Sequence, residues 1–125
     1  MKKTMLIRSF LLFFITINSV DAQNGLKEIG EGDQPSLAST NGVIALSYGN
    51  GDDIFFVSSN DNGKTFSSPE KDATLKGMVM GMSSGPQLSM GEDYYSIIAP
   101  NRAGDLTAWR KKPAATTWEG PFKVN

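Results

Sequence analysis

The sequence predicts an all-β fold in which a four-stranded antiparallel unit occurs twice. Short apolar runs alternate with turns rich in Gly, Asn and Asp, and no window carries the apolar period of a long amphipathic helix. The second half of the chain also repeats the order of the first half at a spacing near 50 residues. Repetition of a four-stranded unit at this spacing is typical of propeller blades, so we expect two antiparallel blades of a partial β-propeller.

The first unit, residues 35–85, is expected to contain four strands. These are apolar, aromatic or β-branched runs bounded by turn residues, at 36–38, 43–48, 54–59 and from Lys64 to near Pro69. Asn41-Gly42 lies between the first two strands. This pair favours a type I′ hairpin, because both of its residues tolerate a positive φ.

The second unit, residues 86–125, repeats these features in the same order. Leu88 follows Leu37 by 51 residues, and Thr117 follows Thr65 by 52. We align GVIALSYGNGDDIFFVSS with DYYSIIAPNRAGDLTAWR, and the two offsets indicate that the loops of the two units differ by a single residue. Two blades leave edges exposed, since a propeller closes with roughly four to eight. We therefore expect further blades or identical subunits as partners.

The first 34 residues are expected to lie outside the repeated units. Residues 1–22 have the positive start (Lys2, Lys3), the apolar run and the small residue before cleavage (Ala22) of a secretory signal peptide. The apolar run is shorter than the roughly 20 residues that cross a bilayer, so no membrane contact is expected after signal removal. Residues 23–34 are polar and glycine-rich and form a lead-in segment. The mature protein is thus expected to be secreted or periplasmic.

The composition excludes several kinds of site. The 125 residues include neither histidine nor cysteine, which excludes a Ser-His-Asp triad, a histidine-bound zinc and a thiolate nucleophile within this chain. The net charge of −1 at pH 7 provides no basic stripe for nucleic acid. We expect no metal and no cofactor.

A short motif follows the third expected strand of the first unit. Ser, Asp, Gly and Thr occupy alternate positions and an aromatic residue comes next: Ser59, Asp61, Gly63, Thr65 and Phe66. This pattern resembles the Asp-box, Ser-x-Asp-x-Gly-x-Thr-aromatic, of the bacterial neuraminidase repeat (BNR) in sialidase-like β-propellers. The resemblance extends from residue 35 to the C-terminus.

The second unit carries a degraded copy of this motif. Lys111, Pro113 and Ala115 stand where the box has Ser, Asp and Gly, whereas Thr117 and Trp118 keep its ending. Such drift between copies is expected of blades within one long chain.

Each box residue has a structural role by elementary chemistry. Asp61 can accept backbone N–H groups of its own turn, and Ser59 can hold the same loop. Gly63 supplies a positive φ without steric cost. Phe66 is expected to pack between neighbouring strands and blades. A calcium loop is the alternative reading, but the stretch offers one carboxylate only, so a structural box is favoured.

The resemblance implies catalytic residues that this chain does not assemble. Sialidases use a tyrosine nucleophile beside a glutamate, an aspartate acid/base and three arginines for the substrate carboxylate. No arginine occurs between Arg8 and Arg102. Asp72, the aspartate placed for the acid, follows the box too closely, and Tyr94-Tyr95 lie on an expected strand. We therefore assign no catalytic residue.

The sequence thus indicates an exported, sialidase-like Asp-box β-propeller segment that is non-catalytic in this chain and scaffolds a glycan-facing propeller. Two alternatives stay open: the N-terminal fragment of an exo-α-sialidase, a glycoside hydrolase with its remaining residues on further blades, or an oligomerising two-blade lectin. The candidate contacts for a glycan ligand are Arg102, in a loop of the second unit, and Trp109. Trp118 is a further aromatic candidate under the lectin hypothesis.

Overall fold

The computed structural model describes residues 27–125, which form eight β-strands and no helix. The strands are β1 (Asp33–Thr40), β2 (Val43–Asn50), β3 (Asp53–Ser59), β4 (Glu70–Thr74), β5 (Gln87–Met90), β6 (Tyr95–Pro100), β7 (Leu106–Lys111) and β8 (Glu119–Lys123). The expected signal peptide, residues 1–22, lies outside the described residues. The all-β prediction is confirmed for the part of the chain that is described.

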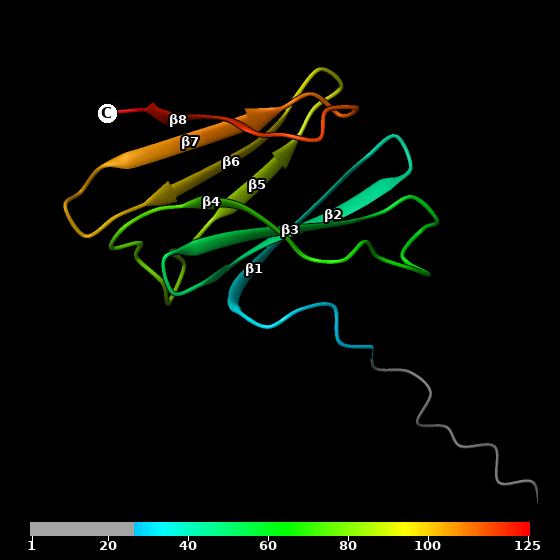
Figure 1. Ribbon diagram of the computed structural model, residues 1–125, viewed down its shortest axis with the longest axis horizontal. Coiled ribbons are helices and arrows are strands. Elements are labelled where there is room, and N and C mark those ends of the chain that lie inside the picture. The colour runs from blue at the N-terminus through cyan, green and yellow to red at the C-terminus, as the bar shows by residue number, and fades with distance from the viewer. Residues whose placement is uncertain (1–26) are drawn as a thin grey trace, which may run out of the picture.

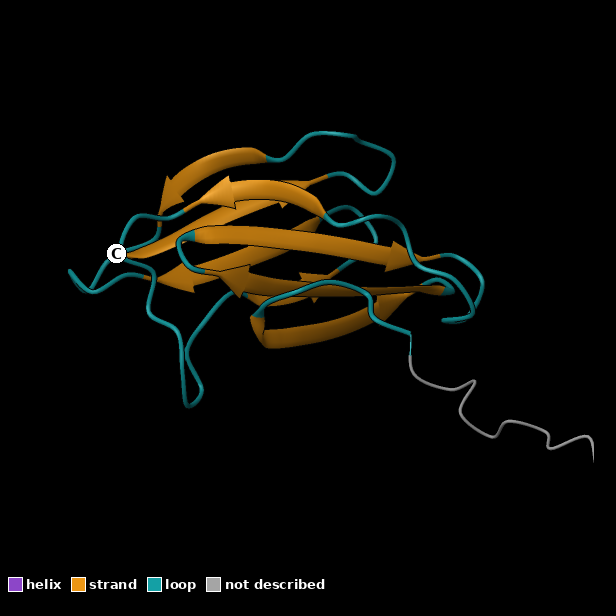
Figure 2. Ribbon diagram, turned by 60° about the horizontal axis from the view of Figure 1, so that its bottom comes forward, coloured by secondary structure: helices purple, strands orange, loops and turns teal. Residues whose placement is uncertain are grey.

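The strands form two antiparallel sheets of four, each in sequence order. We call β1–β4 the first sheet and β5–β8 the second sheet; the second lies above the first in Figure 1. After β4 the chain returns so that β5 lies against β1 and β2 of the first sheet. Figure 2 shows that the regular elements of the described residues are all strands. The prediction of two four-stranded antiparallel units is therefore confirmed.

The hairpin between β1 and β2 has the predicted turn. Asn41 has a φ of 47° and Gly42 a φ of 78°, the two positive values that a type I′ turn requires. The flanking pair is Thr40 with Val43. β1 itself begins at Asp33, two residues before the expected start of the first unit.

The predicted position of the fourth strand was wrong. Thr65 and Phe66 lie in a loop, and β4 begins only after Pro69. The backbone N–H of Thr65 donates to the carboxylate of Asp61 instead of to a neighbouring strand. The Asp61 side chain thus binds the Thr65 N–H that would otherwise bond to β3, and β4 begins only after the loop ends.

The predicted one-residue difference between the loops lies in a hairpin turn. Gly49 pairs with Ile54 at one end of the β2–β3 hairpin, while Pro100 pairs with Leu106 at the matching end of β6–β7. The extra residue therefore lies in the β6–β7 turn. As a consequence, the counterpart of Trp109 in the first sheet is Val57.

The core lies between the inner faces of the two sheets. Its buried members come from both sheets and from the connection between them: Ala45, Ile54, Phe56, Leu75, Met78, Leu88, Tyr95, Ile97, Ala99 and Trp109. Two hydrogen bonds also join the sheets: Ser47 Oγ donates to the carbonyl of Pro86 over 3.4 Å, and Leu88 N–H donates to Ser36 Oγ over 2.9 Å. We call the interface between these two inner faces the seam. Burial of apolar surface at the seam is the main force that holds the sheets together.

Two methionines of the β4–β5 connection fill the space beside a glycine. A Cβ added at Gly49 would lie 2.5 Å from the Met80 methyl carbon and 2.9 Å from that of Met78. Met78 is only 4% exposed, whereas Met82 is fully exposed. The flexible thioether side chains thus pack where β2 has no side chain of its own.

Candidate functional site in two loops and the seam between the sheets

The loop of residues 59–66, here called the box loop, is closed by the carboxylate of Asp61. Its Oδ1 accepts the Thr65 N–H over 2.9 Å and the Ser59 hydroxyl over 2.8 Å. Its Oδ2 accepts the Thr65 hydroxyl over 2.5 Å. The hydrogen bond from the Thr65 side chain is the main reason why the pKa of Asp61 is lowered to about 2. Asp61 therefore stays ionised near neutrality and uses both oxygens inside its own loop.

Ser59 and Gly63 complete the box loop. Ser59 is 1% exposed, and its Oγ accepts the Gly63 N–H over 2.9 Å. Gly63 has a φ of 82°, a conformation that suits glycine. At the base of the loop, Ser67 N–H donates to the Ser58 carbonyl over 2.8 Å. The box loop, directly after β3, is therefore stabilised by hydrogen bonds between its own residues.

Phe66 lies at the rim of the box loop, away from the seam. It is half-buried and lines a hollow together with residues 27–29 of the lead-in segment. Further along, this segment crosses the outer face of the first sheet at Tyr48, which lies within contact distance of Gly30 and Gly32. Among the described residues, Phe66 therefore lies beside the lead-in segment and is not part of the core between the two sheets.

The counterpart loop, residues 111–118, is stabilised by other contacts than the box loop. Lys111 takes the place of the box serine, is 8% exposed and forms none of the ion pairs found among residues 27–125. Its Nζ lies 4.4 Å from the ring centroid of Phe56 and 5.3 Å from that of Trp118. Trp118 also meets Phe56 edge-on, with the ring centroids 5.4 Å apart. Cation–π and aromatic contacts thus tie this loop to the first sheet.

Asp72 lies opposite the counterpart loop, at an irregularity of β4. Lys71 pairs with Phe55 and Ala73 pairs with Ile54, so Asp72 is the extra residue of a β-bulge. Together with five other residues it lines a hollow of about 420 Å³, which we call the seam hollow: Glu70, Lys71, Asp72, Thr116, Thr117 and Trp118. The bulge therefore places a carboxyl group beside the counterpart loop.

The carboxyl of Asp72 is poorly solvated. Burial raises its pKa to about 7; the positive charge of Lys111 opposes this rise, and the negative charge of Glu70 adds to it. Asp72 Oδ2 and Trp118 Nε1 are both shielded from water, and neither completes a hydrogen bond. The indole N–H is nevertheless close enough to lower the pKa of Asp72 by a small amount. The indole N–H of Trp118 and the carboxyl of Asp72 thus lie close together as donor and acceptor.

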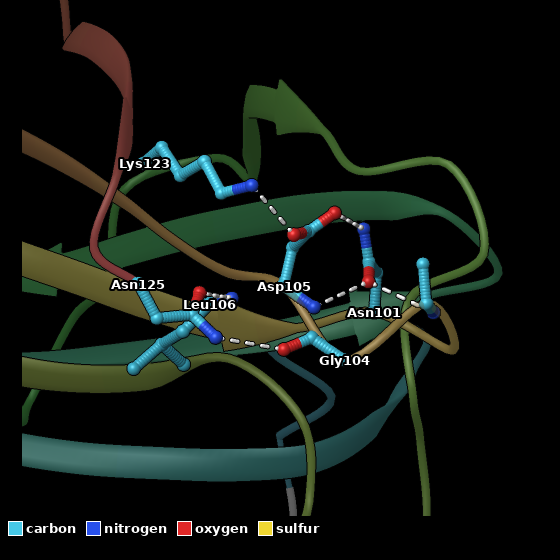
Figure 3. A network of polar contacts seen from close by, with 7 residues as sticks. Asn101, Gly104, Asp105, Leu106, Lys123 and Asn125 are labelled. Carbon is cyan, nitrogen blue, oxygen red and sulfur yellow. Dashed lines mark hydrogen bonds and ion pairs between the residues drawn. The ribbon is translucent and has the colours of Figure 1, made fainter.

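Arg102 lies at the exposed tip of the β6–β7 turn. The turn is closed by Asn101, whose Oδ1 accepts the N–H groups of Ala103 and Asp105, each over 3.0 Å (Figure 3). Lys123 pairs with Asp105 at 3.0 Å and is the main reason why the pKa of this carboxyl is lowered. The backbone N–H of Arg102 donates to the carbonyl of Gly77 over 2.9 Å, and Arg102 is exposed.

Asn125 extends this network to the end of β8. Its side chain accepts the Leu106 N–H over 2.7 Å and donates to the carbonyl of Gly104 over 2.9 Å (Figure 3). These contacts stabilise the β6–β7 turn and the adjoining strand ends, so Arg102 lies at a hairpin end that is held by hydrogen bonds.

Trp109 lies in the core and not on a surface. It is 5% exposed, and a Cβ added at Gly120 would lie 2.7 Å from its ring. The described unit therefore offers no open ring face of Trp109 to a ligand. The structure places Arg102 and Trp109 apart, one in solvent and one between the sheets.

Sequence reasoning did not identify the seam hollow. Asp72 was considered only as a catalytic acid, and Trp118 as the aromatic ending of the degraded box and as a ring for stacking. The bulge in β4 leaves no clear mark in the sequence, and the approach of Lys111 to Phe56 depends on how the sheets pack. The one available signal was the replacement of the box serine by lysine in the counterpart loop.

Neither a metal cluster nor a spanning helix is found in the described range. Residues 27–125 contain no group of three or more acidic, histidine or cysteine side chains placed to hold an ion. None of the secondary-structure elements in this range is a helix long and apolar enough to cross a bilayer. Comparison with protein families, with curated proteins and with solved structures finds no match to this chain.

Proposed function

We propose that the protein is an exported, non-catalytic pair of sialidase-like Asp-box blades that scaffolds a glycan-facing β-propeller. The observation that carries the proposal is the closed box loop. Both oxygens of Asp61 bind donors within four residues, so this carboxylate has little capacity left for a substrate. Its chemistry is that of a turn fastener, which is the role that the Asp-box resemblance implies.

The arrangement of the sheets supports the same proposal. The chain leaves the outermost strand of the first sheet and returns to β5, beside β1. Equivalent faces of the two sheets then point the same way, so that one face of the first sheet packs on the opposite face of the second. Repetition of this step would build a ring of blades around the first strands.

The proposal that the chain is non-catalytic has a direct test. The seam hollow contains a carboxyl of raised pKa but no arginine among its lining residues. We expect the purified full chain to release no fluorophore from 4-methylumbelliferyl-N-acetylneuraminic acid above the buffer rate between pH 4 and 8. Hydrolysis that Asp72→Asn abolishes would overturn the proposal and favour a sialidase.

A second candidate, an oligomerising lectin, is favoured by the outer face of the second sheet. Ile98 is 37% exposed and Phe122 43% exposed on this face. The matching face of the first sheet, at Ser47 and Phe56, is buried against the second sheet. The outer face of the second sheet is therefore equivalent to the face of the first sheet that the second sheet covers. We propose that an identical subunit covers this outer face.

Light scattering on the full chain tests this assembly. We expect a mass above that of the monomer at tens of micromolar protein and a monomer for Ile98→Lys. Met82→Lys is the matched control, because Met82 is an exposed apolar residue of the β4–β5 connection and is expected to leave the mass unchanged. A monomeric wild-type chain would exclude the oligomer and leave the scaffold proposal in place.

A further inference from the structure

We propose that the outer face of the first sheet is a docking surface for the outer face of the second sheet in another copy of the chain. Residues 27–32, here called the strap, cover part of this docking surface and must leave it before the other copy can bind. Figure 1 shows the strap on the side of the first sheet that faces away from the second sheet. The inference rests on the oligomer proposed above as the second candidate function, and it names the two surfaces that meet.

The repeat relates the outer face of the first sheet to the buried face of the second sheet. Leu37 pairs with Leu46 on this outer face, and their counterparts 51 residues later are Leu88 and Ile97. Both counterparts belong to the core at the seam, where Leu88 is 9% exposed. Leu37 is 67% exposed. A large apolar side chain is thus exposed at a position whose counterpart is covered by another sheet, which is typical of an interface.

The outer face of the second sheet has the matching property. On that face, Ile98 is the counterpart of Ser47, which is fully buried at the seam. At the seam, the face of the second sheet that carries Leu88 covers the face of the first sheet that carries Ser47. The face with Leu37 can therefore cover the face with Ile98 in the same way. Since these faces lie on opposite sides of the two packed sheets, the contact joins two copies head to tail and can repeat until a ring closes.

The strap takes the place of a neighbouring sheet without filling it. Two strap glycines lie against the ring of Tyr48, which is 6% exposed. A hollow of about 160 Å³ nevertheless remains between the strap and Leu46. Among residues 27–125, one hydrogen bond joins the strap to the sheet, from Asn50 Nδ2 to the Glu31 carbonyl over 3.3 Å. A segment with a hollow beneath it and one long hydrogen bond can be displaced at low cost.

Phe66 supports the same exchange. Its counterpart, Trp118, packs edge-on against Phe56 of the other sheet. Phe66 instead lines a hollow with residues 27–29 of the strap. Departure of the strap would leave the ring of Phe66 free to pack on the second sheet of another copy, as Trp118 packs on the first sheet.

Release of the strap tests the inference by light scattering on the full chain. Gly30→Val adds a side chain where even a Cβ would overlap the Tyr48 hydroxyl, so the strap can no longer lie on the face. We expect this variant to assemble at a protein concentration about tenfold or more below that of the wild type, because a covered face binds only in the fraction of chains whose strap is away. Gly91→Val is the matched control. A Cβ at Gly91 would lie 3.3 Å from its nearest neighbour, and this variant should assemble as the wild type does.

Cross-linking identifies the faces that meet. At the seam, the Leu88 N–H donates to Ser36 Oγ, and the counterparts of these residues are Leu37 and Gln87. In the docked pair, Leu37 of one copy should therefore lie beside Gln87 of another. The chain has no cysteine of its own, so Leu37→Cys and Gln87→Cys can be joined by a short bismaleimide. We expect a covalent dimer when the two variants are mixed and none with either variant alone.

Three outcomes would overturn the inference. Assembly of Gly30→Val that is equal to or weaker than that of the wild type would show that the strap does not cover the docking surface, and the oligomer would still stand. Linkage of either cysteine variant with itself, or no linkage in the mixture, would exclude the head-to-tail contact. Monomers for both the wild type and Gly30→Val would exclude the oligomer as well. The cross-linking leaves the strap unchanged, so it decides the docking even if Gly30→Val does not fold.

Discussion

The box loop and the counterpart loop occupy the same place in their units but are stabilised by different partners. In the box loop, the Ser59 hydroxyl and the Asp61 carboxylate bind groups within four residues. In the counterpart loop, Lys111 and Trp118 reach across the seam to Phe56 of the first sheet. One loop is therefore fastened by local hydrogen bonds and the other by tertiary packing.

This difference shows how a repeat tolerates the loss of a motif. The counterpart loop has no carboxylate at the box position, because Pro113 stands there. Its aromatic ending is kept, and there the ring has a sheet to pack against. Contact with a neighbouring unit thus replaces the internal hydrogen bonds in the counterpart loop, whereas the box loop, which lies beside the lead-in segment, retains its own hydrogen bonds.

The largest effect is expected from Trp118→Ala. Removal of a fully buried aromatic side chain costs about 3–5 kcal/mol, so the half-buried Trp118 should cost about 2–3 kcal/mol. Phe66→Ala, at the equivalent position, should cost less than about 1.5 kcal/mol, because its ring does not lie between the sheets. Urea denaturation of both variants measures the difference. Equal losses would show that the two loops are stabilised in the same way.

The next effect concerns pH and Asp72. Its pKa is raised from 3.8 to about 7 in the folded protein, so its contribution to stability is full below about pH 4 and is lost as the pH rises toward 7. Such a shift corresponds to about 4 kcal/mol in a fully shielded site, and partial exposure reduces it to an order of 2 kcal/mol. Asp72→Asn should therefore be more stable than the wild type at pH 8 and similar to it at pH 4.

Denaturation midpoints of the wild type and Asp72→Asn between pH 4 and 8 measure this prediction. Asp93→Asn is the matched control, since this exposed carboxyl lies outside the seam hollow. A gap between the wild type and Asp72→Asn that does not widen from pH 4 to pH 8 would contradict the assignment of a poorly solvated carboxyl.

A smaller effect is expected from the pair Ser59→Ala and Lys111→Met. Each should cost about 1 kcal/mol, the first through the three hydrogen bonds of the Ser59 hydroxyl and the second through the cation–π contacts. Hydrogen exchange distinguishes them. Ser59→Ala should expose only amides of the box loop, whereas Lys111→Met should raise exchange on both sides of the seam. The reverse pattern would show that the box loop is not stabilised by its own hydrogen bonds, or that the counterpart loop is not stabilised by packing across the seam.

The smallest effect is expected from Asp61→Asn. The lowered pKa of Asp61 means that its contribution to stability is present above about pH 4 and is lost as the pH falls toward 2. Asp61→Asn should therefore weaken protection of the Thr65 amide at pH 7 and resemble the wild type at pH 2. Amide exchange measured at both pH values tests this. A Thr65 amide that exchanges equally in both proteins at pH 7 would exclude the fastener role.

Local features of the fold were accessible from the sequence, and features that depend on distant residues were not. The type I′ turn at Asn41-Gly42 follows from the φ preferences of two adjacent residues. The start of β4 was misplaced because the hydrogen bond from Thr65 to Asp61 competes with the sheet. The one-residue difference between the loops was accessible from the sequence, but the turn that contains it became clear only from the strand pairing of β6 and β7.

By itself, the sequence determined the all-β class, the two four-stranded units and the residues that close the box loop. Each depends on alternation along a strand or on hydrogen bonds between residues a few positions apart. Only the tertiary structure decided that Trp109 is buried, that Lys111 turns toward Phe56 and that Asp72 faces Trp118. Burial and the pKa of a carboxyl depend on which surfaces meet, and these surfaces meet only when two sheets, distant in the sequence, pack face to face.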